Sequence, residues 1–171
     1  MNETLQTMWA RRSVRKYKPD PIPEADLNLI LEAARMAPTG GNRQRWQMVV
    51  ITDAEQRRKT AEACNGQMWV AQAPVILCML ATPEGNKPNG TIVLDHAILA
   101  AKSLGYGTCW IGAFDAEQVK AVLGVPADYD VVYLTPVGVP DQDPAFRGRK
   151  PRAELFMKER FGEPLDYHIE E

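Results

Sequence analysis

The chain has 171 residues, of which 45% are hydrophobic and 25% charged, and 20 Lys and Arg stand against 22 Asp and Glu for a net charge of −2. Ordinary apolar content and small net charge exclude intrinsic disorder. A chain of this length buries roughly 70% of its unfolded surface on folding. We therefore predict one globular domain over residues 1–171 that needs no disulfide or metal.

Hydrophobic periodicity predicts two helices in the N-terminal part of the chain. Leu5, Met8 and Trp9 have helical spacing, and this first helix is expected to end at the basic run that follows. Residues 23–37 carry an apolar side chain every three or four positions, which predicts a strong amphipathic helix that Pro38 stops.

The rest of the chain alternates between strands and helices without a strict pattern. In chain order we predict a strand at 46–52, a helix at 54–64, a buried strand at 74–81, a polar loop at 83–90, an apolar helix at 91–104, a short extended run at 107–114, a helix capped by Asp115, a strand at 129–139 and a short helix or arm at 152–161. Helices outnumber strands, so we predict an α+β fold with helices on a small mixed sheet.

Basic residues are concentrated at two places near opposite ends of the chain. Residues 11–18 hold five basic side chains and residues 147–152 hold four, and neither segment contains an acid. The rest of the chain carries 11 basic residues against all 22 acids. Such runs are often only solvated surface. The Arg-x-Ser-x-Arg pattern, however, combines guanidinium groups with a hydroxyl, which suits a compact phosphate.

Two glycine-containing segments are candidates for contact with a flat ligand. Residues 37–46 form a predicted loop in which Asn42 and Gln44 offer donors and acceptors to a heterocycle edge. An ordinary polar loop is the alternative. Residues 105–115 follow a helix rather than a strand, so they do not match a dinucleotide fingerprint. They form an apolar loop whose free N–H groups can face a ring atom that becomes electron-rich on reduction.

The cysteines and histidines predict neither a metal centre nor a nucleophile. Cys64, Cys78 and Cys109 are widely spaced and odd in number, which favours a reducing compartment. We interpret Cys109 as buried and inert, His96 as structural and His168 as a solvated residue of the tail. Residues 1–6 lack the apolar core of a secretory signal, and the longest apolar run, 73–81, is too short to cross a bilayer. We expect a cytoplasmic protein with no membrane partner.

The order of four motifs resembles that of the nitroreductase family of FMN-dependent oxidoreductases. The motifs are Arg-Arg-Ser-Val-Arg-Lys-Tyr at 11–17, Ala-Pro-Thr-Gly-Gly-Asn-Arg-Gln at 37–44, Leu-Gly-Tyr-Gly-Thr-Cys-Trp-Ile-Gly at 104–112 and Arg-Lys-Pro at 149–151. The resemblance covers nearly the whole chain. It implies an intertwined homodimer with FMN at the subunit interface and NADH or NADPH as electron donor.

The resemblance also assigns candidate residues to each part of the flavin. The phosphate and ribityl contacts would come from Arg11, Arg12, Ser13, Arg15, Arg147 and Arg149. The loop from the partner subunit would contribute Pro38, Thr39, Gly40, Asn42 and Gln44. The segment beneath the isoalloxazine would be Trp110, Ile111, Gly112 and Ala113, with the Gly112 N–H facing N5, and Asn65, with Gln67 nearby, matches a contact to the pyrimidine edge.

The sequence departs from the family at two places that bear on substrate choice. The frequent Gln-Pro-Trp is here Gln44-Arg45-Trp46, and the loop at 83–90 is short where many members carry longer insertions. The acceptor and the preferred nicotinamide therefore stay open.

The resemblance implies a hydride relay from NAD(P)H through flavin N5 to an electrophile such as a nitroaromatic or a quinone. No side chain is assigned as a catalytic acid or base, because solvent can supply the proton. The alternatives are a non-catalytic flavin carrier or sensor, and a relative that fragments flavin or removes halogen. A phosphate- or nucleic-acid-binding module is a third alternative, although the acidic remainder of the chain and the lack of any RNP, KH or zinc-finger pattern argue against nucleic acid.

Overall fold

The computed structural model describes residues 1–165, and it contains a four-stranded sheet in the order β1-β2-β4-β3. The strands are β1 Trp46–Ile51, β2 Val75–Ala81, β3 Gly107–Thr108 and β4 Asp130–Gly138. Each of the three strand pairs is antiparallel. We predicted a mixed sheet, and this detail of the prediction is wrong. Within residues 1–165, parallel pairing is confined to an isolated bridge between Ser13 and Thr108. The α+β class is confirmed.

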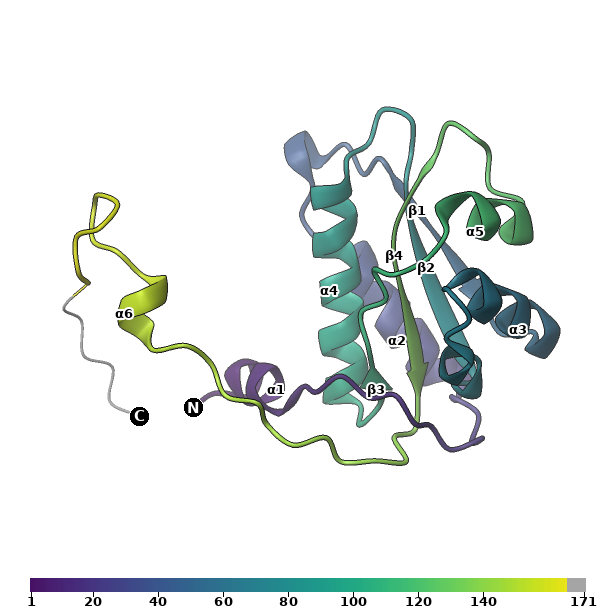
Figure 1. The fold of residues 1–171 in the computed structure, drawn as a ribbon, viewed down its shortest axis with the longest axis horizontal. Coiled ribbons are helices and arrows are strands. Elements are labelled where there is room, and N and C mark those ends of the chain that lie inside the picture. Colours follow the sequence, from purple (N-terminus) through teal and green to yellow (C-terminus); the bar gives the residue numbers. More distant parts are fainter. Residues whose placement is uncertain (166–171) are drawn as a thin grey trace.

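Helices cover both faces of the sheet (Figure 1). They are α1 Glu3–Ala10, α2 Glu24–Arg35, α3 Ala54–Ala63, α4 Lys87–Ser103, α5 Ala116–Leu123 and α6 Arg152–Leu155, with 3₁₀ turns η1 Gly40–Asn42 and η2 Met68–Gln72. The predicted helices are present, although the last is helical only over Arg152–Leu155, and neither 3₁₀ turn was foreseen.

The central strand β2 separates two hydrophobic layers. All seven of its residues are buried. Val75, Leu77 and Met79 pack with α2 and α4, whereas the intervening Ile76, Cys78 and Leu80 pack with α3 and α5. Successive side chains of a strand point to opposite faces, so one continuous apolar run supplies both layers.

Helix α4 begins one turn earlier than the sequence predicted. We expected a loop to residue 90, but the Asn86 side chain accepts a hydrogen bond from the Asn89 N–H and caps the helix there. Pro88 lies in the first turn, where its missing N–H costs nothing. Gly90 is buried in the helix, and a Cβ there would lie 3.1 Å from Met79 and Val132. Close packing, rather than a turn, thus accounts for this glycine.

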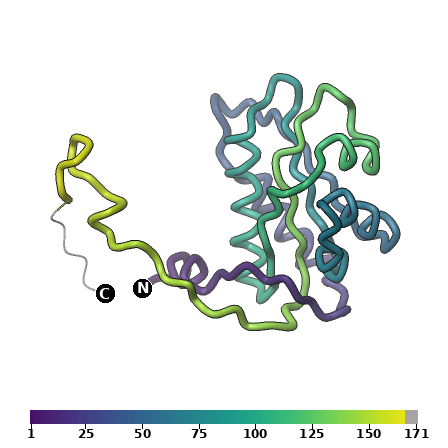
Figure 2. The backbone as a smooth tube through the Cα atoms, viewed as in Figure 1, coloured from purple at the N-terminus to yellow at the C-terminus, as the bar shows by residue number. Residues whose placement is uncertain are grey.

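The two ends of the described chain run side by side along the lower edge of the body (Figures 1 and 2). The Lys18 N–H donates to the Val139 carbonyl at 2.9 Å, and the Asp141 N–H donates to the Lys16 carbonyl at the same distance. Beyond this pairing the chain leaves the body as an extended arm that carries α6. Sequence spacing could not show this arrangement, because the paired residues are more than 120 positions apart.

Among the helices of residues 1–165, none is long and apolar enough to cross a membrane. His168, which we interpreted as a solvated residue of the tail, lies outside the described residues.

Candidate functional site

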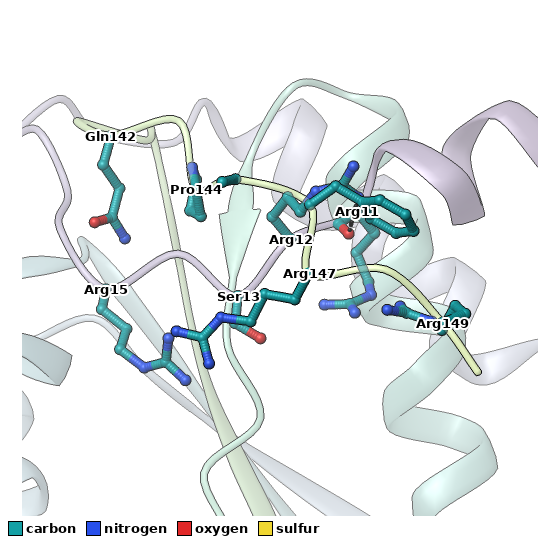
Figure 3. A pocket seen from close by; sticks show the side chains of 10 residues that line it. Arg11, Arg12, Ser13, Arg15, Gln142, Pro144, Arg147 and Arg149 are labelled. Atoms are coloured by element: carbon teal, nitrogen blue, oxygen red, sulfur yellow. Dashed lines mark hydrogen bonds between the residues drawn. The ribbon is translucent and has the colours of Figure 1, made fainter.

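The two basic segments of the sequence form the walls of one cavity of about 400 Å³ (Figure 3). Its lining residues are Arg11, Arg12, Ser13, Arg15, Gln142, Pro144, Ala145, Phe146, Arg147 and Arg149. The structure thus brings together all six residues predicted to contact a phosphate. The sequence did not predict that Gln142, Pro144 and Phe146 line this cavity. Their position just before the second basic segment was the one feature of the sequence that indicated it.

Backbone pairing holds the first basic segment against the sheet. The Val14 N–H donates to the Thr108 carbonyl at 2.9 Å, beside the Ser13–Thr108 bridge. Gly107 makes this approach possible, because a Cβ there would lie only 2.8 Å from a Val14 methyl group. Val14 and Tyr17 are buried and anchor the segment, whereas Arg11, Arg12 and Arg15 line the cavity.

The cavity is a concentration of positive charge with no neutralising side chain. Five arginines and no carboxylate line it. Within residues 1–165, none of the five forms an ion pair, and the buried Nη1 of Arg11 has no hydrogen-bond partner. The side chains of Arg15 and Arg147 point toward one another (Figure 3). Converging like charges and an orphaned guanidinium nitrogen are stabilised by a bound anion.

The segment Trp110 to Ala113 lies beside the end of α3. Ile111 exchanges two backbone hydrogen bonds with Leu134, at 2.8 and 3.1 Å. The Gln67 side-chain amide donates to the Ala113 carbonyl at 2.9 Å. The Gly112 N–H has no hydrogen-bond acceptor among the described residues, so it is free to donate to a ligand.

Asn65 belongs to the same region, two residues before Gln67. Its φ is +55°, a left-handed conformation that Asn tolerates better than most residues. The Asp115 N–H donates to the Ala63 carbonyl at 2.9 Å, which fixes the end of α3 next to the apolar segment. The structure therefore brings the neighbourhood of Asn65 close to the predicted ring-binding segment.

Arg15 connects this region to the basic cavity. Its guanidinium carbon lies 5.9 Å from the centre of the Trp69 ring, in the 3₁₀ turn that follows Gln67. Burial raises the pKa of the Cys109 thiol, next to Trp110, and the charge of Arg15 and the hydroxyl of Ser13 lower it by less, which places both residues near this thiol. The residues predicted to bind the phosphate therefore lie next to those predicted to bind the ring in the folded structure.

The predicted loop at residues 38–44 lies elsewhere. Its Gly40 N–H donates to the Asn89 side chain at 3.2 Å, in the first turn of α4. Lys102, at the other end of α4, lines a smaller cavity together with Arg11 and Arg12. These two positions on the helix are about 20 Å apart at 1.5 Å per residue. A single chain therefore does not bring the loop to its own basic cavity.

The loop is held in a defined conformation although most of it is exposed. Asn42 and Gln44 have φ values of +53° and +50°. The Gln44 side-chain amide donates to the Asn42 carbonyl at 3.2 Å, and the Gln44 N–H donates to the Thr39 hydroxyl at 3.0 Å. Arg45, at the position of the family's frequent proline, forms an ion pair with Glu84 at 2.7 Å. This ion pair ties the loop to the short connection before α4.

Cys109 is buried as we predicted, and so are the other two cysteines. All three are unpaired. Burial raises the pKa of both the Cys64 and the Cys78 thiol to about 12, which suppresses the reactive thiolate. Among residues 1–165 there is no group of His, Cys, Asp and Glu that could hold a metal ion. The Ile92 carbonyl of the same helix accepts a hydrogen bond from His96 Nδ1 at 3.0 Å.

Comparison with known proteins points to one family. A sequence model of the Nitroreductase family matches residues 9–89 and 89–139. The chain is 32% identical over 159 residues to a putative NADH dehydrogenase/NAD(P)H nitroreductase of Archaeoglobus fulgidus, covering 85% of this chain and 90% of that protein. It is 28% identical over 198 residues to the FMN reductase [NAD(P)H] of Bacillus subtilis, and this alignment covers 99% of this chain and 80% of that protein.

A solved structure agrees with these sequence comparisons. The NADPH:FMN oxidoreductase from Vibrio harveyi complexed with NAD+ superposes with a TM-score of 0.87 at 27% identity, covering 95% of this chain and 79% of that one.

Proposed function

The chain belongs to the nitroreductase family, and from this premise we propose that it transfers a hydride from NADH or NADPH through FMN to an electrophilic small molecule. Relatives named FMN reductase and NADPH-flavin oxidoreductase support the general activity, so the chain is an FMN-dependent NAD(P)H oxidoreductase. The relay through flavin N5 and an acceptor such as a nitroaromatic or a quinone form the specific proposal.

The residues present fit a flavin phosphate. The orphaned Nη1 of Arg11 and the five guanidinium groups without a carboxylate are suited to an anion, and phosphate oxygens accept the paired hydrogen bonds that arginines donate. We assign Arg11, Arg12, Ser13, Arg15, Arg147 and Arg149 to the phosphate and its adjoining ribityl chain. This cavity is the single observation that carries the proposal.

The apolar segment after β3 is assigned to the flavin ring. FMN supplies the redox chemistry, since no amino-acid side chain accepts and returns a hydride. In this proposal the Gly112 N–H donates to N5, Trp110, Ile111 and Ala113 flank the ring, and Asn65 contacts its pyrimidine edge. These residues orient the ring and stabilise charge on it, and no side chain acts as acid or base because solvent supplies the proton.

We propose that the functional unit is a homodimer. The loop at residues 38–44 lies about 20 Å along α4 from the cavity of its own chain, so a second copy is needed if this loop is to reach the ligand. The arm supports the same conclusion, since Leu155, Phe156 and Phe161 are exposed on it, Phe161 to 95%. Apolar residues gathered on a segment that leaves the body are typical of a surface that another chain covers.

The visible spectrum of the purified protein tests the proposal. We expect flavin absorbance that is bleached by NADH or NADPH and restored by a nitroaromatic or a quinone, and a dimer in sedimentation. Colourless protein that takes up no added FMN would refute the flavin proposal. Bound flavin with no nicotinamide oxidation, whatever the acceptor, would favour the carrier or sensor instead. A stable folded monomer that retains FMN would contradict the shared site.

A further inference from the structure

Phe146 lies among the arginines of the basic cavity and contacts two of them through its ring. The guanidinium carbon of Arg12 is 4.7 Å from the ring centre, and that of Arg149 is 5.4 Å away. Both distances are within the range in which a cation is attracted by the quadrupole of an aromatic ring. The Trp9 ring is 5.6 Å from the Phe146 ring at an angle of 36°, which attaches it to α1.

The contacts of Phe146 are unlike those of a core residue. Its side chain is 43% exposed and belongs to none of the three hydrophobic clusters of the described chain. Trp9, its aromatic neighbour, is itself 57% exposed. The stability of the fold therefore depends little on this ring, and the partners that give it a defined place are Trp9 and the two arginines.

The two arginines come from opposite ends of the chain, and they have few other ties. Arg12 donates to the carbonyls of Trp9 and Arg11, and Arg149 donates to the Gly148 carbonyl at 2.7 Å. No side chain of residues 1–165 offers either of them a negative charge. Without the ring, two long and mutually repelling side chains would lose part of their orientation in the absence of a ligand.

We propose that Phe146 is a positioning residue that holds Arg12 and Arg149 ready to bind the phosphate of the flavin. A guanidinium that stacks on a ring keeps its N–H edges free, and those edges form the two parallel hydrogen bonds that phosphate accepts. The ring also joins the N-terminal and C-terminal basic segments into one binding surface. This inference rests on the proposed flavin function, and it concerns the phosphate only.

The test compares FMN with riboflavin, which has the same ring system but no phosphate. Full-length protein freed of flavin is titrated with each ligand, and quenching of flavin fluorescence gives the dissociation constants. Phe146→Leu keeps an apolar side chain and removes the quadrupole. We expect it to weaken FMN binding by roughly five- to thirtyfold, from two cation–π contacts. Riboflavin binding is expected to weaken much less, because riboflavin lacks the phosphate that Arg12 and Arg149 are proposed to bind.

Two further variants control the comparison. Phe146→Tyr retains the aromatic face and should restore wild-type FMN affinity. Arg35→Met removes an exposed guanidinium on α2, outside the cavity lining, and should leave the affinities for both ligands unchanged.

Each outcome decides the proposal. An FMN-specific loss in Phe146→Leu that Phe146→Tyr reverses supports it. Equal loss of FMN and riboflavin would show a structural role, and unchanged FMN affinity would show no role; either result overturns it. If Phe146→Leu does not fold, loss of FMN affinity in a folded Phe146→Tyr variant would still overturn it, and retention would support it. Failure of the wild-type protein to bind either ligand would instead refute the flavin function itself.

Discussion

Replacing Arg11 by methionine is expected to stabilise the flavin-free protein while it weakens FMN binding. Arg11→Met keeps a long flexible side chain and removes the charge and its donors. In the absence of a ligand the buried Nη1 has no hydrogen-bond partner among residues 1–165, and an unsatisfied buried donor costs about 1–3 kcal/mol. Arg11 is half-buried, so we expect the lower end, a gain of about 1 kcal/mol in the free energy of unfolding.

The bound state is expected to change in the opposite direction. A hydrogen bond to a charged group contributes about 1.5–3 kcal/mol, so FMN affinity should fall by roughly 10- to 150-fold. At an FMN concentration of about 100 times the wild-type Kd, the ligand stabilises the wild-type protein by about 2.7 kcal/mol. If the variant binds about 30-fold more weakly, the same concentration stabilises it by only about 0.9 kcal/mol. The order of stability should therefore reverse when FMN is added.

Urea unfolding at several FMN concentrations measures both effects in one experiment. Arg35→Met is the matched control, because Arg35 lies on α2 and forms an exposed bidentate pair with Glu32, at 2.6 and 2.7 Å. Its effect should be within about 0.5 kcal/mol at every FMN concentration. A destabilised flavin-free Arg11→Met protein, or a variant that FMN stabilises as much as the wild type, would refute the reasoning.

Three further predictions concern the surroundings of the site. Gly107→Ala should cost about 1–3 kcal/mol of stability by overpacking against Val14. Gly40→Ala, whose Cβ would meet only the Asn89 amide nitrogen at 3.9 Å, is the control for steric crowding; an unchanged urea midpoint in Gly107→Ala would contradict the close approach. Burial, and then the hydrogen bond to Asp26, raise the pKa of Tyr106 to about 12. The unfolded chain loses this proton near pH 10, so stability should fall between pH 10 and 12, and less steeply in Tyr106→Phe; equal slopes would show that Tyr106 does not contribute. The three buried cysteines should resist an aromatic disulfide reagent at pH 8 until the protein is denatured, whereas one fast thiol in the native state would show an exposed cysteine.

Most of the elements were predictable because their signals are local. Helical spacing, the Asp115 cap with Gln118 at the third position, and the continuous apolar run of β2 each depend on residues a few positions apart. The start of α4 was misjudged because Pro88 and Gly90 favour a loop locally. Proline is tolerated in a first turn, and packing against Met79 selects glycine there.

The amino-acid sequence by itself determined the positions of the two basic segments, the class of the fold and the family resemblance. Tertiary structure alone decided that these segments meet in one cavity, that Phe146 lies between two of their arginines, and that the loop at 38–44 is held at the far end of α4. The physical reason is the distance along the chain. Periodicity reports on neighbours within a few residues, whereas these contacts join residues separated by up to about 140 positions and depend on how the sheet, α4 and the arm pack.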